Sequence, residues 1–98
     1  MVAYVISELE VRDQAAFGQY RALAAASIAH HGGRYLVRGG AIEVAEGGPP
    51  PVSIVIVEFP DLERLRRWYR SPEYGAALAF RDAALSRRLL FVEGVALA

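Results

Sequence analysis

Arg81 is the residue whose position in the sequence most directly suggests binding chemistry. It lies at helical spacing from Tyr74 and Leu85, which predicts that its side chain shares the face that packs against a sheet. A buried guanidinium stays protonated and therefore needs a carboxylate or an anionic ligand beside it. Glu58, near the end of a predicted strand, is the candidate partner. Either the two side chains form a buried ion pair that fixes the helix on the sheet, or they line a pocket in which Arg81 holds a substrate carboxylate.

A second arginine and a group of aromatic residues are further candidates. Arg38 precedes Gly39-Gly40, which permits close approach of the backbone or a ligand; the alternative is a bulged strand end with a solvated arginine. Trp68 and Tyr74 lie on either side of a predicted helix break, where aromatic rings form a pocket wall or anchor both helices to the core. The residues that we expect to bind a ligand are Arg38, Arg81, Tyr74, Trp68 and Tyr35.

Glu58 and His31 are the side chains that we expect to move a proton, as general acid or base. His31 follows His30 at the end of a predicted helix, and neighbouring helical side chains point about 100° apart. This spacing predicts that the two histidines do not bind one metal ion. Protonated His31 is also favoured by the helix dipole, so helix capping is the alternative to a role at a pocket mouth. We expect neither a metal nor another cofactor.

The composition excludes several other kinds of site. Cysteine, lysine, asparagine and threonine are all absent from the 98 residues. Without cysteine there is no disulfide and no thiolate nucleophile or metal ligand, and without lysine there is no Schiff base and no P-loop. The net charge is zero, and the arginines of residues 64–70 have acidic residues close by. We therefore expect a solvated helix face there and no nucleic-acid binding.

The hydropathy pattern also excludes a membrane span. No stretch approaches the ~20 uninterrupted apolar residues that are needed to cross a bilayer. Residues 1–6 are apolar, but they lack a basic leader and are followed by Glu8 and Glu10, which is the reverse of a signal peptide. We therefore expect a cytoplasmic protein without membrane contact.

The elements that must position these residues follow from the spacing of the apolar residues. Strand-like composition is found in residues 2–11, 34–46 (with a bend at Gly39-Gly40), 52–59 and 89–95. Helical spacing is found in residues 14–30 and 62–69, and in a further helix that begins at Ser71-Pro72. The order β-α-β-β-α-β predicts a ferredoxin-like α+β fold in a single domain, residues 1–98. In this fold a four-stranded antiparallel sheet carries the helices on one face, here with the second helix broken near Ser71-Pro72.

The predicted strands do not alternate between apolar and polar residues, as a sheet with one solvated face would. Residues 52–57 are apolar on both faces except at Ser53, and residues 4–6 and 89–92 behave in the same way. The helices cover one face, and an exposed apolar sheet is unfavourable in so small a domain. We therefore expect a homodimer whose sheets pack face to face; the alternative is that these residues reflect β-propensity alone.

Several stretches resemble a known bacterial family when they are taken together. They are Tyr4-Val5-Ile6, His31-Gly32-Gly33-Arg34-Tyr35-Leu36-Val37-Arg38-Gly39-Gly40, Val57-Glu58-Phe59-Pro60, Trp68-Tyr69-Arg70-Ser71-Pro72-Glu73-Tyr74 and Val92-Glu93-Gly94. In this order and spacing they resemble the family catalogued as domain of unknown function 1330, which implies a dimeric α/β barrel. The chain departs from the family pattern at Gly75, where glutamine is usual, and at Ser53, where a basic residue is frequent.

The resemblance supplies no reaction, because a fold alone does not determine a function. Two classes remain open. The first is an enzyme or binding protein that acts without a metal on a small carboxylated organic molecule, with Arg38 and Arg81 orienting the anion and Glu58 or His31 moving a proton. The second is a non-catalytic accessory or binding dimer in which the arginine–glutamate pairs are structural. An enclosed pocket onto which Arg81, Glu58 and Tyr74 converge would support the first class.

Overall fold

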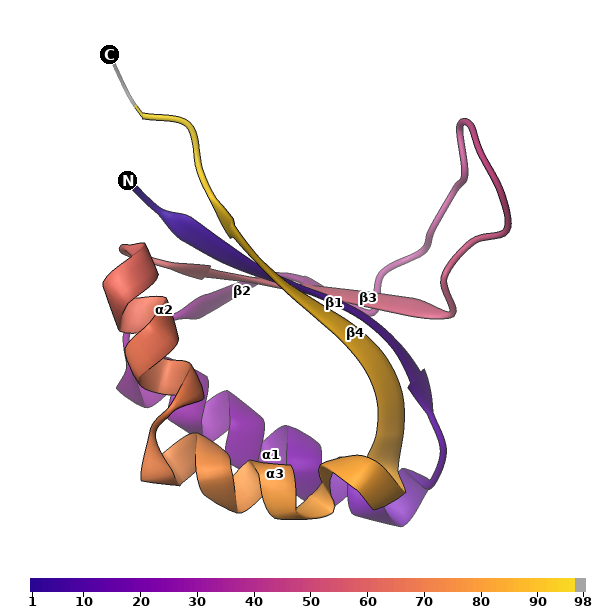
Figure 1. The fold of residues 1–98 in the computed structure, drawn as a ribbon. Coiled ribbons are helices and arrows are strands. Elements are labelled where there is room, and N and C mark those ends of the chain that lie inside the picture. Colours follow the sequence, from indigo (N-terminus) through magenta and orange to yellow (C-terminus); the bar gives the residue numbers. More distant parts are fainter. Residues whose placement is uncertain (97–98) are drawn as a thin grey trace.

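Seven elements follow one another along the chain in the computed structural model, which describes residues 1–96 (Figure 1). They are β1 (Ala3–Val11), α1 (Gln14–His30), β2 (Arg34–Arg38), β3 (Ser53–Phe59), α2 (Leu62–Tyr69), α3 (Pro72–Ala84) and β4 (Leu85–Glu93). The strands form one antiparallel sheet in the order β2-β3-β1-β4. The predicted α+β fold of the β-α-β-β-α-β type, with its second helix in two parts, is confirmed.

Local sequence signals set the two ends of α1. Asp13 is the N-cap, and its carboxylate accepts a hydrogen bond of 3.0 Å from a backbone N–H of the first turn. At the other end His31 is the C-cap, and Gly32 takes the left-handed conformation with φ +80°. The N–H of Gly33 then donates to the carbonyl of Ile28, as in a Schellman motif. The chain therefore turns directly from α1 into β2.

A serine hydroxyl joins α2 to α3. The Oγ of Ser71 donates to the carbonyl of Trp68 at 2.7 Å and accepts from the N–H of Tyr74 at 3.1 Å. Pro72 takes the first position of α3, where no N–H is needed. The predicted break is confirmed, and it brings the rings of Trp68 and Tyr74 together in the core with their centroids 4.2 Å apart.

The sheet has one face covered by helices and one face without them (Figure 1). α1 and α3 lie side by side on the covered face, where Val5, Val57 and Phe59 are each at most 3% exposed. Leu65 and Trp68 of α2 complete this core. None of the helices in residues 1–96 combines the length and the hydrophobicity of a membrane span. Successive side chains of a strand point to opposite faces of the sheet, so the strand residues directly before and after these buried ones face the helix-free side.

Two strand boundaries differ from the prediction. β2 ends at Arg38, because Gly39 makes one last hydrogen bond to the carbonyl of Ile54 and then turns the chain away with φ +74°. Residues 40–52 form a loop that projects beyond the sheet (Figure 1). β4 begins at Leu85 rather than at residue 89. The carbonyl of Ala84 accepts the N–H of Arg12 at 2.8 Å, which joins the end of α3 to the end of β1 and lets pairing start at once.

Candidate functional site

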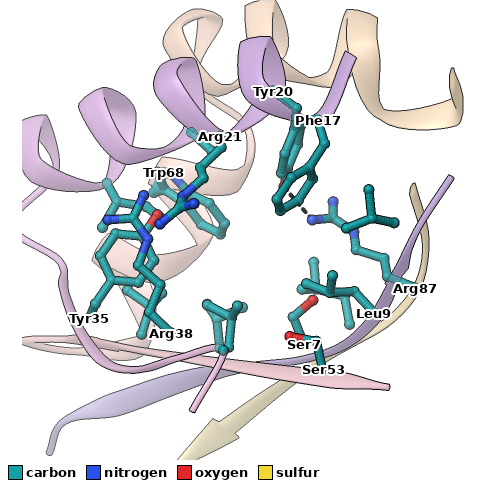
Figure 2. A pocket seen from close by; sticks show the side chains of 18 residues that line it. Ser7, Leu9, Phe17, Tyr20, Arg21, Tyr35, Arg38, Ser53, Trp68 and Arg87 are labelled. Atoms are coloured by element: carbon teal, nitrogen blue, oxygen red, sulfur yellow. Dashed lines mark hydrogen bonds between the residues drawn. The ribbon is translucent and has the colours of Figure 1, made fainter. Parts of the chain in front are cut away.

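A cavity of about 290 Å³ lies between the covered face of the sheet and α1 (Figure 2). Its floor consists of apolar side chains from three strands: Val5, Leu9, Val55, Val57 and Leu89. Its walls include four aromatic rings: Phe17, Tyr20, Tyr35 and Trp68. Three guanidiniums complete the lining: Arg21, Arg38 and Arg87. We term this cavity the sheet–helix pocket.

At one end of the pocket Arg87 is held by tyrosine hydroxyls (Figure 2). Its Nη2 donates to the hydroxyl of Tyr74 at 2.6 Å, its Nη1 donates to the hydroxyl of Tyr20, and the two hydroxyls are 2.7 Å apart. The network connects β4 to α1 and α3. Burial raises the pKa of the Tyr74 phenol; the neighbouring Tyr20 adds to the rise and the charge of Arg87 opposes it. We term Arg87, Tyr20 and Tyr74 the tyrosine end.

At the other end Arg38 and Arg21 lie beside Tyr35 (Figure 2). The guanidinium of Arg38 lies over the ring of Tyr35, with its Cζ 4.2 Å from the ring centroid. Arg21 extends toward the same ring from α1. Burial raises the pKa of the Tyr35 phenol, and the charges of Arg38 and Arg21 oppose that rise. We term Arg38, Arg21 and Tyr35 the arginine end.

The lining carries positive charge without a matching negative charge. It contains three guanidiniums but no carboxylate and no imidazole among the residues that the structure describes. The arginine–carboxylate pairs within residues 1–96 involve other arginines. Ser7 adds a buried hydroxyl that has no hydrogen-bond partner in the same part of the chain. Charge interactions are strong where water is partly excluded, so the net charge of this lining is positive in electrostatic effect as well as in count.

Three of the predicted ligand-binding residues, Tyr35, Arg38 and Trp68, line the pocket. Trp68 donates from Nε1 to the hydroxyl of Ser27 at 2.9 Å, so the polar edge of its indole is already engaged in the core. Tyr74 does not line the cavity; it is fully buried behind the wall and reaches the pocket through the tyrosine end.

The predicted Arg81–Glu58 pair does not form, and neither residue lines the pocket. Glu58 faces the helix-free side, where its Oε1 is 3.1 Å from Nε of Arg34. The Nε of Arg81 is 3.3 Å from Oδ1 of Asp82, and the Arg81 side chain is 37% exposed. The reason is the orientation of α3, since Arg81 flanks its buried stripe. That stripe consists of Tyr74, Ala77 and Ala84. The predicted convergence of Arg81, Glu58 and Tyr74 on one pocket is therefore wrong.

His31 is also absent from the pocket lining and lies at the end of α1. The prediction that His30 and His31 cannot reach one metal ion is wrong. His31 is the C-cap, and its φ of −97° turns its side chain away from the direction that it would have inside a regular helix, so the angular spacing of two helical residues does not apply. The Nε2 atom of each histidine is 3.5 Å from a carboxylate oxygen of Glu73.

Among the polar and charged residues of the pocket, four were not predicted as candidates: Ser7, Tyr20, Arg21 and Arg87. All four carry a readable signal. Ser7 lies two residues from Val5 on β1 and Arg87 two residues from Leu85 on β4, so each shares the face of that apolar neighbour, and Tyr20 lies on the apolar stripe of α1. The signal at Arg87 depends on starting β4 at residue 85. Arg21 lies four residues after Phe17 and three before Ala24, which places it on the pocket-facing side of α1 although its side chain is exposed.

Of the two positions at which we expect a departure from the family pattern, Ser53 lines the pocket. A basic residue there would add another positive charge to the cavity. Gly75 is exposed on α3, and a Cβ at this position would meet no atom within 4 Å. A longer side chain at residue 75 therefore fits without changing the pocket.

Solved structures of low sequence identity share the fold. The RPA0582 protein of unknown function from Rhodopseudomonas palustris is similar with a TM-score of 0.78 and 20% identity, over 98% of this chain and 84% of that chain. Methylated RPA0582 gives a TM-score of 0.78 and 19% identity, over 97% and 82%. SnoaB, a cofactor-independent oxygenase from Streptomyces nogalater, gives a TM-score of 0.62 and 19% identity, over 98% and 94%. These likenesses concern the fold and do not transfer an activity.

No curated protein matches the sequence significantly. The model of the family described as domain of unknown function (DUF1330) matches residues 2–95, which is nearly the whole chain. The match agrees with the resemblance seen in the sequence, and the chain belongs to the DUF1330 family.

Proposed function

We propose that the sheet–helix pocket binds a compact organic anion, whose carboxylate is held by Arg38 and Arg21 at the arginine end. The observation that carries the proposal is the charge of the lining, with three guanidiniums and no carboxylate in the described residues. A guanidinium and a carboxylate form charge-assisted, often bidentate hydrogen bonds. Because Arg38 stacks on the ring of Tyr35, its N–H groups remain available to such a ligand.

The size and polarity of the pocket restrict the rest of the ligand. Its volume of about 290 Å³ lies at the lower end of the roughly 300–1,000 Å³ that is typical of ligand pockets. The apolar floor and the rings of Phe17 and Trp68 favour a flat apolar body. The buried hydroxyl of Ser7 can donate to a second polar group. We therefore expect an aromatic or cyclic carboxylate.

The lining supports binding better than acid–base catalysis. Glu58 and His31 lie outside it, and the titratable lining side chains of the described residues are phenols and guanidiniums. Burial raises the pKa of Tyr35, so near neutral pH this phenol is a proton donor and not a base. Within the first of the two classes left open by the sequence, an enzyme or a binding protein for a small carboxylated molecule, we propose the binding protein without general-base chemistry.

The single tryptophan of the chain, Trp68, lines the pocket and gives a direct fluorescence test. Benzoate and benzamide have the same ring and similar size but differ in charge. We expect benzoate to change the fluorescence in a saturable way and to bind at least about tenfold more tightly than benzamide, which corresponds to roughly 1.4 kcal/mol. Phenylacetate and 1-naphthoate extend the series toward longer and larger carboxylates.

Arginine variants assign the carboxylate to one end of the pocket. We expect Arg38→Ala and Arg21→Ala each to weaken benzoate binding about fivefold or more and to leave benzamide binding unchanged. Arg88→Ala is the matched control, because Arg88 is exposed on β4 and faces the helix-free side. Equal affinity for benzoate and benzamide, or no saturation with any of the three carboxylates, would contradict the proposal.

We also propose that the helix-free face of the sheet binds a second copy of this chain. Its centre is apolar: Tyr4, Ile6, Val37, Ile54, Ile56, Leu90 and Val92. Groups of opposite charge flank this centre, with Glu8 opposite Arg88 and Glu58 paired with Arg34. A face that carries both signs beside an apolar centre is complementary to itself across a two-fold axis.

The exposed surface supports the same proposal. The accessible area is 6315 Å², whereas a typical monomer of 10.7 kDa exposes about 5,500 Å². The excess of about 800 Å² includes the projecting loop of residues 40–52, and it is comparable to the area that each partner buries in a standard interface. A second copy on the helix-free face would remove apolar area from water without any change of fold.

Two leucines with the same exposure give a matched test of the dimer. Leu90 lies on the helix-free face and Leu23 on α1, and each is 37% exposed. By light scattering we expect the native chain and Leu23→Arg to have the mass of a dimer and Leu90→Arg to have the mass of a monomer. A monomer mass for the native chain would contradict the proposal, and so would an intact dimer in Leu90→Arg.

A further inference from the structure

His30, His31 and Glu73 bring three metal-ligating side chains together where the end of α1 meets the start of α3. Their ligand atoms all lie within 4.8 Å of one another. The Nε2 of His30 is 3.5 Å from Oε1 of Glu73, and the Nε2 of His31 is 3.5 Å from Oε2 of the same carboxylate. None of the three residues lines the sheet–helix pocket, so this cluster is independent of the function proposed above.

The distances fit the ligands of one ion better than they fit hydrogen bonds. Hydrogen bonds from N–H to oxygen mostly have heavy-atom distances of about 2.7–3.2 Å. Ligand atoms that surround a tetrahedral Zn²⁺ at about 2.0–2.1 Å lie about 3.3–3.4 Å from one another. Both nitrogen–oxygen separations in the cluster, at 3.5 Å, lie just above this second range, and all three ligand atoms lie within 4.8 Å of one another.

The Nε2 atom of His31 gives a second indication. It is buried and has no hydrogen-bond partner within the described residues. Buried polar nitrogens in folded proteins are normally satisfied, and an imidazole nitrogen without a donor or acceptor is free to bind a metal ion. The side chain of His31 is 19% exposed, so packing holds this ligand in place. Glu73 and His30 are 44% and 66% exposed and can adjust around an ion.

We propose that His30, His31 and Glu73 bind a single divalent cation of the zinc class, through the two imidazole Nε2 atoms and the carboxylate. Imidazole nitrogen suits Zn²⁺, Co²⁺ and Ni²⁺, whereas Mg²⁺ and Ca²⁺ require oxygen ligands. Three protein ligands leave the fourth position of a tetrahedral ion open to water or an anion. The ion would tie the C-terminal end of α1 to the first turn of α3.

The arginines around the cluster favour an anion in the fourth coordination position of the metal ion. Arg66, Arg67 and Arg70 line a surface hollow together with His31 and Glu73. Arg67 is neutralised by Glu63, with 2.6 Å between Nη2 and Oε1. The remaining positive charges oppose a bare cation but favour a cation that carries an anionic fourth ligand. We therefore expect zinc affinity to rise when chloride or acetate is present, a dependence that a simple electrostatic attraction of the cation to Glu73 would not give.

The test uses untagged, metal-stripped protein, because a polyhistidine tag would bind the same ions. We expect isothermal titration with ZnCl₂ to give one site with a dissociation constant of about micromolar or tighter. Co²⁺ should give the intense visible bands of tetrahedral coordination, and a large excess of Mg²⁺ should not compete. His30→Gln, His31→Gln and Glu73→Gln should each weaken Zn²⁺ binding about tenfold or more.

Glu10→Gln is the control, because Glu10 is an exposed carboxylate on β1 that does not line this hollow. Its affinity for Zn²⁺ should equal that of the native chain. Absence of saturable Zn²⁺ binding would overturn the proposal, as would native affinity in all three ligand variants. Circular dichroism checks that each variant is folded. His30→Gln, which changes the most exposed of the three side chains, decides the matter if another variant unfolds.

Discussion

The two ends of the sheet–helix pocket use the same pair of groups, a guanidinium and a phenol, in two different ways. At the tyrosine end Arg87 donates hydrogen bonds to the hydroxyls of Tyr20 and Tyr74. At the arginine end Arg38 lies over the face of the Tyr35 ring, and its guanidinium makes no hydrogen bond within residues 1–96. The guanidinium of Arg87 therefore uses N–H donors within the protein, whereas the N–H donors of Arg38 remain free.

This difference suggests that one end of the cavity stabilises the fold and that the other end is available to a ligand. The tyrosine end connects three elements, β4, α1 and α3, and its phenol of Tyr74 is fully buried. Loss of its groups leaves buried polar atoms without partners, which is costly. The two arginines of the arginine end are exposed on α1 and β2. These two side chains can be removed with little cost to the fold, and they can therefore serve a ligand.

The largest expected effect is that of Tyr74→Ala at the tyrosine end. Truncation of this fully buried ring should lower the free energy of unfolding by about 3–5 kcal/mol, through the cavity and through the lost partners of Tyr20 and Arg87. Tyr35→Ala removes the same atoms from a half-buried ring at the other end, and it should cost about 1–2 kcal/mol. Urea denaturation of the two variants measures the difference. Equal losses would remove the distinction between the ends.

A smaller loss is expected from Arg87→Ala. The guanidinium contributes hydrogen bonds from a charged group to two hydroxyls, each partly or fully buried, so we expect a cost of about 1.5–3 kcal/mol. Arg88→Ala, at the next residue of β4, changes an exposed side chain on the other face and should cost less than about 0.5 kcal/mol. A stable Arg87→Ala variant in the same denaturation experiment would mean that the two hydroxyls suffice to hold the tyrosine end together.

Alkaline pH should weaken the tyrosine end. Burial raises the pKa of Tyr74 above its usual value of 10.0, so the folded state holds this proton more tightly than the unfolded chain does. The stabilisation is complete below pH 10 and is lost as the pH rises from 10 toward the raised pKa. In that window the free energy of unfolding should fall about 1.4 kcal/mol per pH unit more steeply in the native chain than in Tyr74→Phe. Parallel curves for the two proteins would show that Tyr74 does not titrate differently on folding.

Most of the fold followed from local signals in the sequence. Asp13, Asp61 and Ser71 cap helices as their residue types favour, and Gly32 ends α1 with a positive φ. The strand limits were harder to predict, because they depend on contacts between distant segments. The early start of β4 follows from the hydrogen bond between the carbonyl of Ala84 and the N–H of Arg12, which no local pattern encodes.

The site was less predictable than the fold for a related reason. A guanidinium reaches several ångströms from its Cα, so the helical position of Arg81 or Arg21 does not determine where its charge lies. Arg81 shares the helical spacing of Tyr74, yet its guanidinium lies beside Asp82; Arg21 shares the spacing of Phe17, and its exposed side chain lines the pocket. The position of Arg87 is easier to predict. Arg87 lies two residues from both Leu85 and Leu89, so it shares their face of the sheet once the register of β4 is known.

The smallest expected changes in stability are those of Arg21→Ala and Arg38→Ala, and they test the comparison most directly. Arg21 is exposed, so its loss should change the free energy of unfolding by less than about 0.5 kcal/mol. Arg38 also loses its contact with the Tyr35 ring, so its loss should cost less than about 1 kcal/mol. Removal of either positive charge from a lining without carboxylates can even stabilise the protein, since it relieves repulsion among Arg21, Arg38 and Arg87. A gain in stability together with a loss of benzoate binding would identify the arginine end as a site maintained for its ligand. A loss of stability as large as that of Arg87→Ala would show that both ends of the pocket serve the fold.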